Sequence, residues 1–318
     1  MIFNWKNIPV ATGVLISANI AIWLVGIANS ETAVLAVDTD ILLDFGAMFS
    51  PLIAEGEFWR LLTAIFLHHD LAHIFFNSFG LFIFGRSVER IYGHNRFVII
   101  YILTGLSGSV TSYVLSSIGI GAGASGAIFG VLGSLAAYLA TERHFLGNVG
   151  QRDLIGILII ACISLIYGLA TPGVDNWAHL GGFVAGLVLG LVLAPRYRAS
   201  TDQFGNSTGL TDHNALAKRW YAIPLATILL ILGAWLGTVT LDSNAYSHLY
   251  RAEQHLNNGE YDLALRETEE AIRVTRPIDS TQSFPAIGET QLMRARIYAE
   301  IGDTRSARNE LGLSLIHI

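Results

Sequence analysis

The sequence predicts an all-α polytopic membrane protein with a six-helix core, a seventh transmembrane helix and a soluble domain of helical hairpins. Hydrophobic residues make up 52% of the 318 positions and charged residues only 14%, well below the roughly 25% charged residues of soluble proteins. Seven apolar stretches come close to the ~20 residues that cross a hydrocarbon core of about 30 Å. They lie at 9–28, 72–88, 97–119, 124–141, 154–171, 178–194 and 221–240.

The first stretch is expected to remain in the membrane as a helix. Acidic sequence follows it and no small-residue cleavage site ends it, so it differs from a removed signal peptide. Cys162 is the only cysteine and lies within the fifth stretch. The sequence therefore excludes an intrachain disulfide framework.

The basic residues between the stretches predict the orientation, because positively charged loops stay on the cytoplasmic side. With the N-terminus inside, ten of them fall on the inner face: Lys6, Arg86, Arg90, Arg96, Arg143, Arg152, Arg196, Arg198, Lys218 and Arg219. The long loop after the first stretch is acidic and contains Arg60. Seven crossings then place the C-terminal domain outside. Topology accounts for the basic residues, so we expect the lipid bilayer, and no nucleic acid, as a partner.

A soluble domain is expected after the seventh stretch, at 242–312, where charged residues become frequent. Small residues and one aromatic residue recur there as in a tetratricopeptide helix hairpin: Ala252, Gly259, Tyr261, Ala264 and Ala271, then Ala295, Gly302 and Ala307. The spacing of the two hairpins exceeds ~34 residues, and a loop at 276–289 is expected to absorb the excess. Two hairpins are fewer than the usual three, so the array is expected to be incomplete.

The last six residues, Leu313 to Ile318, read "LSLIHI". They resemble the translation of a transposon end used as a sequencing adapter. We therefore interpret 313–318 as a non-native tail, expect the natural chain to continue, and exclude His317 from functional reasoning. The alternative is an ordinary apolar helix end.

Three groups of polar residues open the even-numbered stretches, and polar residues are costly in lipid. His73 and Asn77 are separated by four residues and share a helix face. Ser125 opens the fourth stretch, and His179 lies one turn into the sixth. Taken singly, each residue has a plainer explanation: Ser125 as a hydroxyl bonded to its own helix, His179 as a hydrogen-bonded polar residue at a helix start, and Asn77 as a hydrogen-bonding contact between helices. Their shared depth below the outer surface, which packing does not require, favours a catalytic site.

The chemistry assigns a different task to each residue. A serine hydroxyl needs a base to become a good nucleophile at neutral pH, and imidazole has a suitable pKa. Ser125 would be the nucleophile and His179 the base. The backbone N–H of Ser125 and the amide of Asn77, with His73 as a further candidate, would stabilise the oxyanion. No HExxH-like cluster supports a metal mechanism, and no cofactor is predicted.

Glycines at helical spacing explain how the base would reach the nucleophile. Gly126 and Gly130 follow Ser125, and Gly182 and Gly186 follow His179. Small residues four apart allow helix backbones to approach closely. The fourth and sixth stretches are therefore expected to pack against each other.

Four motifs together resemble the rhomboid intramembrane serine proteases over roughly residues 9–194. They are "WR" at Trp59–Arg60, "HxxxN" at His73 and Asn77, "GASG" at Gly123–Gly126, and "AHLGGFVAG" at Ala178–Gly186. The resemblance implies a six-helix core around an outward-facing cavity and a Ser125–His179 dyad with no acidic third member. It also implies an oxyanion site at His73 and Asn77 and cleavage of single-span substrates near the outer face. A seventh helix with a tetratricopeptide-like tail is similar to a bacterial branch, so we expect a bacterial cytoplasmic membrane.

The resulting division of the chain is a rhomboid core at 1–200, a cytoplasmic linker at 201–219, a seventh helix at 220–241, a tetratricopeptide-like domain at 242–312 and the tail at 313–318. The tetratricopeptide-like domain is expected to bind a protein or peptide, such as a substrate.

Several alternatives remain open on the sequence. Asp175 could be a triad acid, although an N-cap role is favoured. Phe129 stands where the family often has tyrosine, and its ring can pack on His179 without donating a hydrogen bond. His68 and His69 are expected to be solvated in the outer loop. The alternative function is an inactive rhomboid-like adaptor that binds clients through its tail; such relatives usually lack the serine or histidine, and this chain has both.

Overall fold

The computed structural model describes residues 9–31, 35–116, 120–171, 173–201, 207–241, 245–275 and 280–317. Lys6 lies outside these residues, as do 117–119 of the third predicted stretch and 242–244 of the predicted soluble domain, and the side chains of Arg143 and Arg198 lie outside the description as well. The chain divides into two compact units, residues 1–49 with 58–234 and residues 50–57 with 235–318.

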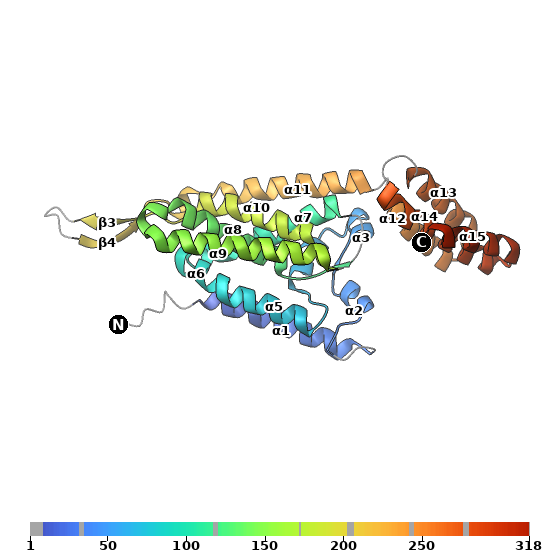
Figure 1. The fold of residues 1–318 in the computed structure, drawn as a ribbon, viewed down its shortest axis with the longest axis horizontal. Helices are drawn as coiled ribbons and strands as arrows, with labels where there is room; N and C mark the ends of the chain where they lie inside the picture. Colours follow the sequence, from blue (N-terminus) through green and yellow to red (C-terminus); the bar gives the residue numbers. More distant parts are fainter. Residues whose placement is uncertain are drawn as a thin grey trace. The chain divides into compact units, whose positions relative to one another are not determined.

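Six helices in the described part of the chain are long and apolar enough to cross a membrane, and they run along one another in Figure 1. This confirms the predicted all-α polytopic class. They are α1 Val10–Asn29, the rod Leu71–Tyr92 made of α5 Leu71–Gly80, η3 Leu81–Gly85 and α6 Arg86–Tyr92, α7 His94–Leu115, the Leu146–Ala170 part of α9 Arg143–Ala170, α10 Asn176–Leu193 and α11 Ala222–Leu241.

The fourth predicted stretch forms a shorter helix, α8 Ser125–Thr141, of 17 residues. At 1.5 Å per residue it is roughly 25 Å long, less than the ~30 Å of a hydrocarbon core. Most of its residues are buried, from Gly126 through Ala137 without interruption. A helix this short and this well covered cannot reach both membrane surfaces, so at least one of its ends lies below a surface.

Two helices extend furthest beyond their predicted limits. The second stretch continues to Tyr92, beyond the predicted position 88, and contains one π-helical turn at Leu81–Gly85. The fifth begins at Arg143 instead of 154, but Gly147 interrupts it with φ 58° and ψ −145°. A left-handed φ of this kind is easily adopted only by glycine, so a short helical segment precedes the transmembrane part of α9.

A carboxylate from α6 caps the start of α1. Glu89 accepts hydrogen bonds from the backbone N–H groups of Ala11 and Thr12, both at 2.7 Å, and from the Thr12 hydroxyl. Its side chain is fully buried and also contacts His94 Nδ1. The first N–H groups of a helix have no intrahelical partner, and Pro9 at the N-cap supplies none. Glu89 therefore joins α1 to the second transmembrane rod.

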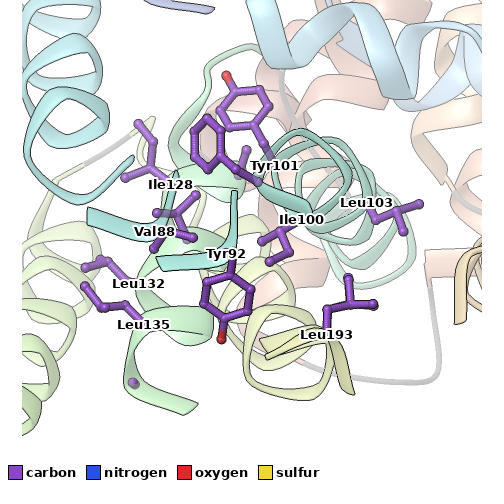
Figure 2. Packing of buried hydrophobic residues seen from close by; sticks show 14 of the residues in the cluster. Val88, Tyr92, Ile100, Tyr101, Leu103, Ile128, Leu132, Leu135 and Leu193 are labelled. Atoms are coloured by element: carbon purple, nitrogen blue, oxygen red, sulfur yellow. The ribbon is translucent and has the colours of Figure 1, made fainter. Parts of the chain in front are cut away.

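The core of the membrane unit lies where α6, α7, α8 and α10 meet. Tyr92, Ile100, Tyr101 and Leu132 are among its buried side chains (Figure 2). The Tyr92 hydroxyl lies 2.9 Å from the carbonyl oxygen of Ser134 and 3.1 Å from that of Gly190, so it can donate to either. These contacts hold α6 across the pair formed by α8 and α10.

The loops contain short elements. The first long loop has α2 Thr39–Asp44, β1 Met48–Phe49, α3 Ser50–Ala54, α4 Arg60–Thr63 and η2 Ala64–Phe66. Strand β1 pairs antiparallel with β2 Ile120–Gly121, directly before α8.

The described part of the predicted linker at 201–219 contains regular secondary structure. It contains most of an antiparallel hairpin, β3 Tyr197–Thr201 with β4 Ser207–Asp212, followed by η4 Leu216–Lys218. Arg96 binds the Asp212 carboxylate at 2.6 Å, and Asn214 donates to the carbonyl oxygens of Val192 and Ala194. The linker is thus fastened to the ends of α7 and α10, which its composition alone does not reveal.

The C-terminal unit contains two helix pairs, α12 Ala245–Asn257 with α13 Tyr261–Thr275 and α14 Ser280–Ile301 with α15 Thr304–His317. Gly259 and Gly302 turn the chain between the partners with φ of 76° and 89°, and Ala252, Ala264 and Ala271 are fully buried. The predicted loop at 276–289 is wrong for most of its length, because α14 already begins at Ser280.

Candidate active site

Ser125 is the first residue of α8 and is partly exposed. Strand β2 and Gly123 lead into it, and the Gly123 N–H donates to the carbonyl oxygen of Ala64 at 2.9 Å. This bond ties the turn before α8 to the first long loop. The positive end of a helix dipole favours negative charge, so the position suits a side chain at which charge develops.

Gly123 also allows the turn before Ser125 to lie close to His73. Its φ is +135°, and a Cβ built on it would lie 2.6 Å from His73 Nε2 and 3.8 Å from Ser125 Oγ. A side chain at this position would therefore collide with the His73 imidazole. The close approach of the turn before α8 to His73 requires glycine.

Asn77 lies on α5, one turn after His73, and is 6% exposed. Its side-chain amide donates to the carbonyl oxygen of His73 at 3.1 Å. An amide NH2 group has two donors, so the second remains for another acceptor. Asp70 caps the same helix by accepting from the His73 N–H at 2.8 Å. These bonds hold the backbone that carries both residues.

His179 is 7% exposed and stacks flat on Phe129, with ring centroids 4.2 Å apart and an interplanar angle of 6°. Phe129 lies one turn after Ser125 on α8. The stacking therefore holds the imidazole of α10 beside the helix that carries the predicted nucleophile. Phe129 supplies this flat support without a hydroxyl.

Asp175 is the N-cap residue of α10, the role favoured by the sequence. One carboxylate oxygen accepts from the Ala178 N–H at 2.9 Å, and the other accepts from the Ser112 hydroxyl. His179 Nδ1 is buried and has no hydrogen-bond partner in the structure. Asp175 therefore does not orient the imidazole as a triad acid would.

The four glycines of the predicted helix contact lie together. A Cβ at Gly182 would be 2.0 Å from the carbonyl oxygen of Gly126, and one at Gly186 would be 2.0 Å from that of Gly130. Real Cβ atoms do not come this close to backbone. Only glycine at these positions of α10 allows the present approach to α8, and this approach carries His179 toward Ser125.

Comparisons with known proteins agree with this arrangement. Residues 55–196 match the model of the Rhomboid domain. The chain is 32% identical over 218 residues to RHOMBOID-like protein 6, mitochondrial, of Arabidopsis thaliana, covering 66% of this chain and 69% of that protein. It is 31% identical over 182 residues to the putative rhomboid protease YdcA of Bacillus subtilis, covering 57% and 86%. The chain belongs to the rhomboid family.

A longer relative is the rhomboid protease GluP of Bacillus subtilis, which is 35% identical over 228 residues. The match covers 71% of this chain and 41% of GluP. More than half of the GluP chain therefore lies outside the match.

The structure adds one residue to the site that the sequence prediction missed. His68 was expected to be solvated, but it is 1% exposed and its ring packs edge-on against His73 with centroids 5.0 Å apart. Burial lowers the pKa of His68 to about 3, and the nearby His73 lowers it further. His69 is partly buried and stacks on His73 at 6.0 Å. The sequence around His68 does not indicate burial, because the contact between the His68 and His73 rings depends on how η2 and α5 meet.

A metal role for these histidines has no support. Within the residues that the structure describes, no group of three or more His, Cys, Asp or Glu side chains could hold a metal ion.

Proposed function

We propose that this rhomboid is an intramembrane serine protease that cleaves single-span membrane proteins near the outer membrane face through a Ser125–His179 dyad. The observation that carries the proposal is the flat stack of His179 on Phe129 at 4.2 Å. It holds a buried imidazole beside the helix that begins with Ser125. The printed names of two relatives, rhomboid protease GluP and putative rhomboid protease YdcA, support the same reaction class.

The reaction follows from the roles of these groups. Ser125 Oγ attacks the carbonyl carbon of the scissile peptide bond while neutral His179 accepts the hydroxyl proton. The resulting oxyanion receives hydrogen bonds from the Ser125 N–H, the Asn77 amide and His73. The proton on His179 then passes to the leaving amine, and the C–N bond breaks to leave an ester on Ser125. Water attacks this ester, with His179 again as the base, and hydrolysis restores the serine.

The decisive variants are Ser125→Ala and His179→Ala in reconstituted membranes with a single-span reporter. Each should abolish cleavage. Ser125→Ala should leave expression and thermal stability close to wild type. His179→Ala also loses the stack on Phe129, so thermal unfolding has to show that this variant is folded before its loss of cleavage is assigned to the dyad. Undiminished cleavage by either variant would refute the dyad. Client binding without cleavage by the wild type would instead favour the inactive adaptor.

We further propose that the C-terminal helix pairs are a tetratricopeptide-like module that binds a protein or peptide outside a bacterial cytoplasmic membrane. The glycine turns and fully buried alanines of α12 and α13 support it. Protease added to intact spheroplasts should digest residues 245–317 and spare the loop before α11. Deleting the module should raise KM for natural substrates and leave kcat for a short generic substrate unchanged. An intact tail in spheroplasts, or an equal loss for both substrates, would contradict this assignment.

A further inference from the structure

A hydrogen bond between two side chains joins the last turns of α7 to the start of the neighbouring helix α10 (Figure 1). Ser112 on α7 is 2% exposed, and its hydroxyl donates to one carboxylate oxygen of Asp175, the N-cap residue of α10. The other carboxylate oxygen accepts from the Ala178 N–H at 2.9 Å. Hydrogen bonds to an ionised acceptor are stronger than those between neutral groups. This connection from α7 to the first turn of α10 is called the Ser112–Asp175 link below.

The direction of the Ser112 hydroxyl differs from that of other hydroxyls on α7. Serine and threonine side chains inside a helix often donate to a carbonyl oxygen of the preceding turn. Three hydroxyls of α7 do so, namely Thr104 to Ile100 at 2.7 Å, Ser107 to Leu103 at 2.9 Å and Thr111 to Ser107 at 2.7 Å. Ser112 donates to the neighbouring helix instead. Its hydroxyl therefore connects two helices where the others remain within one.

The Ser112–Asp175 link ends at the residue that directly precedes His179. The carbonyl oxygen of this residue, Ala178, lies close to the backbones of α7 and α8. A Cβ built on Gly108 of α7 would be 2.7 Å from this oxygen, and one built on Gly126 of α8 would be 3.3 Å from it. The N–H of Ala178 is thus held by the link, while its carbonyl oxygen is enclosed by two glycines. The backbone from which the His179 side chain extends is fixed on both sides.

We propose that Ser112 is a positioning residue for catalysis, which acts through Asp175 to hold the backbone of His179 at the distance from Ser125 that proton transfer needs. The proposal rests on the proposed protease function. His179 Nδ1 has no hydrogen-bond partner among the described residues, so no acceptor orients the imidazole from behind. Stacking on Phe129 fixes the plane of the ring, and the Ser112–Asp175 link fixes the backbone that carries it.

The first test removes the hydroxyl. Ser112→Ala breaks the link to α7 and leaves the Asp175 cap in place. It should lower kcat for a single-span substrate about ten-fold at unchanged KM, which is less than the ~10²-fold cost of a misplacement of about 1 Å. The rate at which a small fluorophosphonate labels Ser125 should fall by the same factor, because labelling needs the same base. Ser107→Ala is the matched control, since it makes the same change on the same helix and removes only a bond within α7.

The second test separates the position of the Asp175 side chain from its charge. Asn is also a preferred N-cap residue, and its NH2 group can donate to the Ser112 hydroxyl. Asp175→Asn therefore retains the link without the negative charge, and its kcat should stay close to that of the wild type. Asp175→Ala removes both the cap and the link. Adding Ser112→Ala to Asp175→Ala should lower kcat and labelling no further, as expected for two groups that act through one connection.

Thermal unfolding first establishes which variants are folded, and the two Asp175 variants decide the matter if Ser112→Ala is not. Equal kcat and labelling rates in Ser112→Ala and Ser107→Ala would overturn the positioning role, as would a higher KM at constant kcat. A loss in Asp175→Asn as large as that in Asp175→Ala would also overturn it, because the charge would then be what matters. A wild type that neither cleaves nor labels would refute the protease itself, so the two failures are distinguishable.

Discussion

Replacing Gly186 by alanine should separate the two helices that carry Ser125 and His179. The new Cβ would start 2.0 Å from the carbonyl oxygen of Gly130 and 2.7 Å from its Cα and carbonyl carbon. Real Cβ contacts are essentially never below 3.0 Å, so α8 and α10 must move apart by about 1 Å. Overpacking of this kind costs about 1–3 kcal/mol, and a displacement of about 1 Å at a catalytic site can cost about 10²-fold in rate.

The assay compares Gly186→Ala with Gly156→Ala, which makes the same change in helix propensity without a contact. Thermal unfolding in detergent should show a midpoint roughly 2–12 °C below the control, converting the overpacking cost at about 2–4 °C per kcal/mol. Cleavage of a single-span reporter should fall about 10²-fold. A Gly186→Ala protein that matches the control in both measurements would show that the backbone contact does not position the site.

Three further changes probe other contacts. Glu89→Gln should lower the free energy of unfolding by about 1–3 kcal/mol, because the amide cannot accept all the hydrogen bonds that α1 donates to the carboxylate. The control is Glu55→Gln, at an exposed position, and equal unfolding midpoints for the two variants would contradict the capping role of Glu89. Phe129→Leu should lower kcat while folding is retained, whereas Phe129→Tyr should keep activity; equal rates would exclude a role for stacking. Burial lowers the pKa of His68 to about 3 in the folded protein, whereas a histidine in the unfolded chain has a pKa of about 6.5. The unfolded chain therefore binds a proton first, and acidification from about pH 6.5 to 3 should lower the free energy of unfolding by up to ~1.4 kcal/mol per pH unit. His68→Phe should weaken the dependence of the free energy of unfolding on pH. An identical slope in this variant and the wild type would show that His68 does not cause the dependence.

The sequence contained enough information to predict the order of the helices and the family. The apolar runs identify the six long apolar helices of the described residues because hydrocarbon demands an uninterrupted apolar length. Ser125, His73, Asn77 and His179 were selected as site candidates because polar residues at helix starts are costly in lipid, and their catalytic roles stay predictions. The glycine spacing predicted which helices approach, since a four-residue repeat lies on one helix face.

Features that depend on tertiary contact were not predictable in the same way. His68 has no local signal of burial, because its environment comes from His73 on the next helix. The hairpin that contains Asp212 lies in a polar segment that reads as a linker, and its bond to Arg96 joins positions 116 residues apart. The early start of α14 at Ser280 overrides a stretch whose prolines favour a loop.

Covalent labelling tests the central claim most directly, that His179 activates Ser125 as a nucleophile. The protein in proteoliposomes is treated with a fluorophosphonate, and the modified residue is mapped by mass spectrometry in the wild type and in His179→Ala. The account predicts modification at Ser125 in the wild type and its loss in His179→Ala, with both proteins folded. Modification at another residue, or equal labelling of Ser125 without His179, would contradict the account.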